Sequence, residues 1–352
     1  MPPEWLPIYI HCARIRRMNW DLVGHEWAVK LIKAQIEHDE IRHAYLITGP
    51  NGTGRRTLAL RLAQALNCEQ PLSPGEPCRS CRICRQTENM QHADLFVVRA
   101  EEKGGVLKVD QIRDLQHSLA LQPYEARYRF ALLLQFEQAH VSAMNAILKT
   151  LEEPPKSVIL LLTADSPDNL LPTIVSRCET LRLRPASLDT LTTALQTQAH
   201  LSAENSRLLA HISGGRVGFA LRLAREPGIL ADRTEILEDL FGLLSASIVE
   251  RFAYVNRMYK DKEKVRGIVV TWLSFWRDVV LEAARSSVPI DNLDQQAVVE
   301  QAASNLDIHA AARFVGALER TLELLERNVN PRLICEVLIL DLPHIRIQDH
   351  PS

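Results

Sequence analysis

Hydrophobic and polar positions follow two different periods up to about residue 184 of this chain. Short, fully apolar runs have the length and the aliphatic composition of buried strands. We expect such strands at Ala44–Thr48, Leu95–Val98, Phe130–Leu134, Val158–Thr163 and Thr180–Leu183. Between them, apolar side chains recur at helical spacing, as at Leu58, Leu62 and Ala65 and at Ile112, Leu115 and Leu119. Strands that alternate with helices favour one α/β domain with a parallel sheet over residues 18–184.

After Pro185 the strand pattern disappears and only helical spacing remains. Leu188–Ala199 has the spacing of an amphipathic helix, and Ala311–Arg327 has the same pattern over a longer stretch. Glycines and prolines interrupt these patterns at intervals. We therefore expect a small helical domain over residues 185–242 and a helical bundle over residues 243–352.

Length and composition agree with several folded domains and exclude some classes of protein. A chain of 352 residues is longer than one hydrophobic core usually supports. The formal net charge of -2 argues against a protein that grips nucleic acid over its whole surface. No apolar run approaches the roughly 20 residues that span a bilayer. Near the start, basic residues follow the apolar patch at Ile8–Ile10, which is the reverse of a signal peptide, so we expect a cytoplasmic protein without membrane contact.

Four of the seven cysteines have the spacing of a metal site. Cys68, Cys78, Cys81 and Cys84 form a C-x9-C-x2-C-x2-C array in a stretch rich in proline, glycine and arginine. Four thiolates can bind zinc in a tetrahedral site. The zinc ion would then stabilise this polar stretch, which has too few apolar residues to form a hydrophobic core. With no open position, Zn²⁺ would be structural. Redox-active or unrelated cysteines are the alternative.

A glycine-rich loop follows the first expected strand and precedes a helix, which is the setting of a phosphate-binding loop. Its glycines are Gly49, Gly52 and Gly54. A working loop continues with Lys, which contacts phosphate, and Ser or Thr, which binds magnesium, whereas this chain has Arg55 and Arg56. Arginine cannot bind a cation, and Thr57 comes one position too late to replace the missing hydroxyl.

The acidic pair of a nucleotide hydrolysis site is also incomplete. Such a pair should end a buried strand, with one carboxylate on magnesium and the other activating water. After Phe130–Leu134 the chain has Glu137 at the metal-binding place but Gln138 beside it. An amide cannot accept a proton from water, so we expect no ATP hydrolysis. Weak binding of ATP or ADP through Arg55 stays open.

These features, together with Asn145–Pro155 and Ser176-Arg177-Cys178, resemble the bacterial DNA polymerase III clamp-loader family within the AAA+ proteins. The resemblance covers about Met18 to Gly218. It implies a RecA-like AAA+ domain with a parallel sheet, a small helical lid domain and a C-terminal helical collar that joins subunits in a pentameric ring. Residues 1–17 have no counterpart in the family, so we expect them to be an extension from a misplaced start codon.

Within this family, ATP-hydrolysing gamma or tau subunits carry an intact loop and acidic pair. Delta' subunits commonly keep the zinc module and the Ser-Arg-Cys motif beside a degraded nucleotide site, and this chain resembles that second pattern. The resemblance implies that Arg177 is an arginine finger supplied in trans to a neighbouring ATPase during ATP-driven clamp loading.

The resemblance also implies partners: gamma or tau and delta subunits in the ring and, through the complex, the sliding clamp and primer-template DNA. One alternative is an ATP-hydrolysing gamma or tau motor, which Arg55, Arg56 and Gln138 oppose. The other is a zinc-dependent regulator that binds nucleic acid. Arginines in the cysteine stretch favour it, but Glu69, Glu76 and Glu88 dilute their charge.

Overall fold

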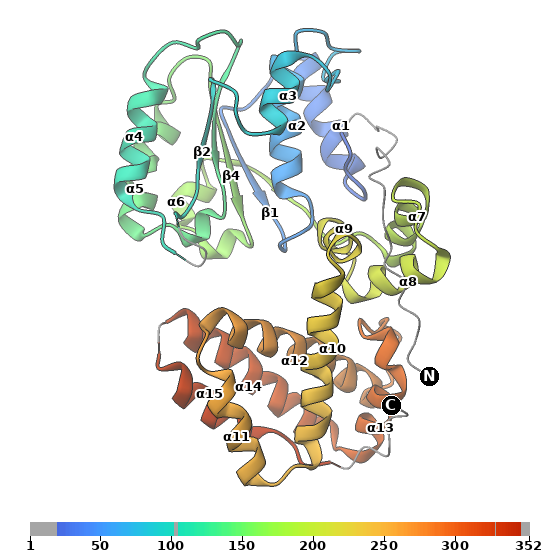
Figure 1. Ribbon diagram of the computed structural model, residues 1–352. Helices are drawn as coiled ribbons and strands as arrows, with labels where there is room; N and C mark the ends of the chain where they lie inside the picture. Colours follow the sequence, from blue (N-terminus) through green and yellow to red (C-terminus); the bar gives the residue numbers. More distant parts are fainter. Residues whose placement is uncertain (1–19, 102–104, 328, 346–352) are drawn as a thin grey trace. The chain divides into compact units, whose positions relative to one another are not determined.

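The computed structural model describes residues 20–101, 105–327 and 329–345, which divide into two compact units (Figure 1). The first unit contains the described residues up to Ser206 together with Gly215–Leu221, and the second contains the remainder. The extension expected at residues 1–17 lies outside the described residues. The lid expected at 185–242 contributes residues to both units, so the division into three domains stays a prediction.

A parallel sheet forms the centre of the first unit. Among the described residues its strands have the order β2-β3-β4-β1-β5. They are β1 (Ala44–Thr48), β2 (Leu95–Val98), β3 (Arg129–Leu133), β4 (Val158–Ala164) and β5 (Glu179–Arg182). The predicted strands are confirmed, although β3 and β5 each begin one residue earlier than expected.

Helices cover both faces of this sheet, because successive strand residues point to opposite sides. Tyr45 and Ile47 pack with α1 and α2 in one core, whereas Leu46 and Leu162 pack with α4 and α5 in the other. Figure 1 shows these two helical layers on either side of β1, β2 and β4. The helices are α1 (Glu26–Glu37), α2 (Arg55–Asn67), α3 (Arg82–Glu88), α4 (Val109–Leu119), α5 (Val141–Glu152), α6 (Pro172–Val175) and α7 (Leu188–Gln198). Short 3-10 turns lie at Phe136–Gln138 and Pro167–Asn169.

The described part of the second unit is helical. Its helices are α10 (Pro227–Ser245), α11 (Ile248–Met258), α12 (Lys262–Ala283), α13 (Gln296–Asn305), α14 (Ile308–Glu326) and α15 (Pro331–Asp341), with a 3-10 turn at Leu293–Gln295. Both α8 (Ala203–Ile212) and α9 (Val217–Arg225) contribute residues to each unit. Trp272, Trp276 and Phe314 are fully buried in one core. The rings of Trp276 and Phe314 pack edge to face, with their centroids 5.1 Å apart.

One buried charge joins the two ends of this helical unit. Arg251 of α11 donates hydrogen bonds to the carbonyl oxygens of Leu243 and Leu244 at the end of α10. It donates two more to the carbonyls of Leu342 and Pro343, after α15. These contacts replace the water that the guanidinium loses on burial. Across the described ranges, no helix is long and apolar enough to cross a membrane.

Candidate functional site

The glycine-rich loop has the backbone shape that its sequence predicts. Gly49, Gly52 and Gly54 all have positive φ angles, of 141°, 90° and 105°. A Cβ atom at Gly49 would lie 2.1 Å from the carbonyl oxygen of Leu183, so only glycine fits there. His25 is buried, and its Nε2 lies 2.9 Å from the carbonyl oxygen of Thr53. The loop is therefore held as a fixed turn between β1 and α2.

The start of α9 packs directly against this loop, within the first unit. The backbone N–H of Gly218 donates to the carbonyl oxygen of Gly52 over 2.7 Å. A Cβ atom at Gly52 would lie 3.1 Å from the backbone nitrogen of Phe219. Protein backbone is thus in contact with the middle of the loop. The loop serves here as a packing surface for a helix.

Arg55 makes an ion pair inside the first unit. Its side chain is only 7% exposed, and its Nη1 lies 2.7 Å from Oδ1 of Asp165. Asp165 follows the end of β4, and the pairing of Thr48 with Ala164 in neighbouring strands brings it beside the loop. The guanidinium therefore has an ion-pair partner within the chain, although Nη1 of Arg55 makes no hydrogen bond to any described residue. Arg56, the next residue, is exposed to solvent.

Glu137 and Gln138 lie in the 3-10 turn after β3. Among the described residues, Oε2 of Glu137 is buried and has no hydrogen-bond partner. Burial raises the pKa of Glu137, and nearby Asp165 raises it further, while Arg55 acts in the opposite direction. The Glu137 carboxylate therefore binds a proton more readily than an exposed glutamate does.

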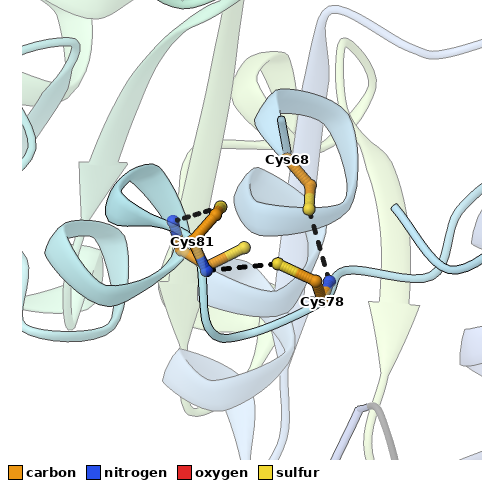
Figure 2. Close-up of side chains that lie close together, drawn as sticks. Cys68, Cys78 and Cys81 are labelled. Carbon is orange, nitrogen blue, oxygen red and sulfur yellow. Dashed lines mark hydrogen bonds between the residues drawn. The ribbon is translucent and has the colours of Figure 1, made fainter. Parts of the chain in front are cut away.

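The four predicted cysteines come together as one cluster, part of which Figure 2 shows. Their sulfur atoms all lie within 4.8 Å of one another. Zinc–sulfur bonds of about 2.3 Å place tetrahedral ligands about 3.8 Å apart, so a small contraction would close the site. The donor set is sulfur alone, which suits a soft or borderline ion. The cluster can hold a metal ion through Cys68, Cys78, Cys81 and Cys84.

Backbone N–H groups around the cluster point at its sulfurs. Cys78 donates to Sγ of Cys68 over 3.3 Å, Cys81 to Sγ of Cys78 over 3.2 Å, and Cys84 to Sγ of Cys81 over 3.4 Å (Figure 2). Burial alone would raise the pKa of Cys78, but hydrogen bonds from Cys81 and Ser80 outweigh it and lower that pKa to about 6. Burial raises the pKa of Cys68 and Cys84. A cation would therefore meet a readily formed thiolate at Cys78 and would have to displace protons from Cys68 and Cys84.

Polar side chains of α2 hold the cysteine stretch in place. Gln64 is buried and donates to the carbonyl oxygen of Cys84 over 2.7 Å and to Glu88 over 3.0 Å. Arg61, also buried, pairs with Glu88 and with Asp21. The pKa of Glu88 is lowered because the contacts with Arg61 outweigh the effect of burial. The cysteine stretch and α2 are thus joined by these side-chain contacts.

Arg177 lies apart from both features, just after α6. Its side chain is 35% exposed, and its Nη1 donates to the carbonyl oxygen of Thr173 over 2.9 Å. Its Nη2 lies 2.8 Å from Oε1 of Glu152, the last residue of α5. The guanidinium is therefore at the surface and held by two neighbouring elements.

Comparison with known proteins gives the family. A sequence model described as DNA polymerase III, delta subunit, matches residues 24–187. The DNA polymerase III subunit delta' of Bacillus subtilis is 30% identical over 325 residues, which cover 89% of this chain and 94% of the relative. This chain belongs to the DNA polymerase III clamp-loader delta' family. The subunit of that name from Pseudomonas aeruginosa is 37% identical over 58% of this chain and 62% of its own length. Subunit tau of B. subtilis is 35% identical over 45% of this chain and 28% of its own length.

The structure of this clamp-loader chain groups most of the predicted site residues into two places, and Arg177 belongs to neither. The loop glycines, Arg55 and Glu137 meet at one end of the sheet, and the four cysteines meet beside α2. Sequence analysis assigned no individual role to Asp165, Glu152 or Gly218. Asp165 could have been found, because an acid directly after a buried parallel strand lies at the edge where such sites form. Gly218 gave no comparable signal, since only the fold brings it to the loop.

Proposed function

We propose that this protein is the delta' subunit of a DNA polymerase III clamp loader and that it works without hydrolysing ATP itself. The contact between Arg55 and Asp165 carries this proposal, because it engages the residue that would otherwise have met phosphate. Exposed Arg56 in the magnesium-ligand position supports it, and so does Glu137, whose buried Oε2 has no hydrogen-bond partner among the described residues.

We propose that the active contribution of the chain is Arg177, given in trans to the γ-phosphate of a neighbouring gamma or tau subunit. A planar guanidinium stabilises the charge that develops on a transferring phosphoryl group. Exposure of Arg177 in the Ser-Arg-Cys segment supports this role. The ring would also contain delta, and the complex would place the sliding clamp on primer-template DNA in the cytoplasm. The helical second unit would serve as the collar.

For the cysteine cluster we propose one structural Zn²⁺ per chain. Four sulfur donors leave no position open for substrate or water, which is typical of structural zinc. The hydrogen bonds from α2 to Cys84 and Glu88 support a role in fixing this part of the domain. The cluster lies apart from the loop glycines, so no part in nucleotide chemistry is assigned to it.

A gamma or tau motor is the second candidate, and the similarity of 45% of this chain to a tau subunit favours it. Arg55 would then have to leave Asp165 and bind phosphate, and another group would have to replace the missing base at Gln138. A zinc-dependent regulator that binds nucleic acid would need free positive charge at the cysteine stretch. Arg79 and Arg82 there are instead paired with Asp21 and Glu125.

ATP turnover by the purified chain separates the first two candidates. We expect no hydrolysis above background, because the magnesium hydroxyl and the general base are both replaced. The measurement is steady-state phosphate release at saturating magnesium and ATP, with an Arg55→Ala variant beside the wild type. Sustained turnover that is lost in the Arg55→Ala variant would identify a motor and reject the proposal.

A further inference from the structure

Arg177 is already paired in this chain. Of its two terminal nitrogens, Nη2 contacts Glu152 at 2.8 Å and Nη1 donates to Thr173 at 2.9 Å and to Ser176 at 3.4 Å. A guanidinium binds phosphate best with two N–H groups along one edge. The edge that faces Glu152 is occupied by a carboxylate, so a phosphate must displace that carboxylate before it can use this edge.

The position of Glu152 is unfavourable for its own helix. It is the last residue of α5 and is followed by Glu153, so two acids stand at the negative end of the helix dipole. Sequences normally place basic residues there. A local choice that a helix does not favour often marks a functional position. Contact with Arg177 is the compensation that the structure provides for Glu152.

We infer that Glu152 is a positioning residue that masks Arg177 until a neighbouring subunit presents its phosphate. This inference rests on the proposed function, since it requires Arg177 to act in trans. In the masked state the edge of the guanidinium that contacts Glu152 is not available to phosphate. When the ring closes, the γ-phosphate replaces the Glu152 carboxylate, and Thr173 keeps the guanidinium in place through its carbonyl oxygen.

Exposure of the pair sets the size of this effect. Glu152 is 51% exposed and Arg177 35% exposed, so water and salt screen their attraction. A pair of this kind changes an equilibrium by about two- to five-fold, which is enough to bias a finger and small enough to be reversed by phosphate. Masking should thus lower the rate of hydrolysis before the ring closes and leave the fully engaged rate unchanged.

The test uses the reconstituted clamp loader with Glu152→Gln and Glu152→Ala, and Glu153→Gln as the matched control. Glu153 is the adjacent exposed acid, so its variant removes the same charge without touching the contact. We expect both Glu152 variants to raise hydrolysis without clamp and DNA by about two- to five-fold. Hydrolysis with clamp and primed DNA should stay at the wild-type rate, so the stimulation ratio falls. The control should match the wild type.

A second measurement reads the masking without turnover. The concentration of ADP and aluminium fluoride that half-saturates the loader should fall by a similar factor in the Glu152 variants, because an unmasked finger binds the phosphate mimic more readily. Unchanged values in both measurements, or a loss of the stimulated rate, would overturn the inference.

Arg177→Ala distinguishes this failure from failure of the proposed function. If Arg177→Ala keeps the wild-type stimulated rate, the finger itself is wrong. If Arg177→Ala lowers that rate while the Glu152 variants behave as wild type, only the masking is wrong. The double variant Arg177→Ala with Glu152→Gln should hydrolyse ATP at the same rate as Arg177→Ala alone. Once Arg177 is gone, Glu152 masks nothing, so its removal should have no further effect.

Discussion

Replacing Arg177 with alanine should slow ATP hydrolysis at the adjacent subunit's site by ~10³-fold, because arginine fingers act on the charge of the transferring phosphoryl group. The fold should be unaffected, since Arg177 lies at the surface and its partners Glu152 and Thr173 remain solvated. Total hydrolysis by the ring should fall only in part, because other sites keep their own arginines. The measurement is ATP hydrolysis and clamp loading by the reconstituted complex.

Two further variants serve as controls for Arg177→Ala. Arg182→Ala removes an exposed arginine only five positions away, at the end of β5, and should leave both rates near the wild type. Arg177→Lys keeps the charge but loses the planar fork, so it should recover little of the rate. Wild-type hydrolysis and loading by Arg177→Ala would reduce Arg177 to a structural residue.

The secondary structure of the first unit followed from apolar periodicity because both faces of its sheet are covered. The error at β3 has a specific cause. Arg129 begins this strand and is only 5% exposed, yet a pattern of apolar residues ends before any arginine. Its charge is compensated by fully buried Asp94, whose Oδ1 lies 3.3 Å from Nη2 of Arg129. Such a pair joins residues distant in sequence, and composition gives no sign of it.

Some candidate site residues can be recognised from the local sequence, whereas their contacts depend on residues far away in the chain. Loop glycines and cysteines are recognisable because the chemistry needs them at fixed spacing within a short stretch. The partners that decide their use come from elsewhere in the chain. Asp165 reaches Arg55 through the register of β1 and β4, and Glu152 reaches Arg177 through the packing of α5 beside α6. The residue types at positions 55, 56 and 138 could be read from the sequence, whereas the ion pair of Arg55 with Asp165 could be read only from the fold.

The second large effect concerns the cysteine cluster. Replacing Cys81 and Cys84 together with alanine should remove all tightly held metal, about one ion per chain, and lower the free energy of unfolding by about 4 kcal/mol. That value corresponds to an ion present at about 1,000 times its dissociation constant. The reason is that α3 and the stretch before it depend on the cluster and on Gln64 and Arg61 for their position. Elemental analysis and denaturant unfolding measure the two quantities.

The loss of stability in the double variant has two sources, the truncated thiol side chains and the lost ion, and a control must separate them. Cys335→Ala is the matched control, because Cys335 is also buried but lies in the core of the second unit, away from the cluster. It should keep the metal and show only the smaller cost of a truncated side chain. A strong chelator should destabilise the wild type and Cys335→Ala by the same amount and leave the Cys81/Cys84 double variant unchanged. Full metal retention in the double variant would contradict the assignment of these ligands, and metal loss without any change in unfolding would show that the ion does not support the fold.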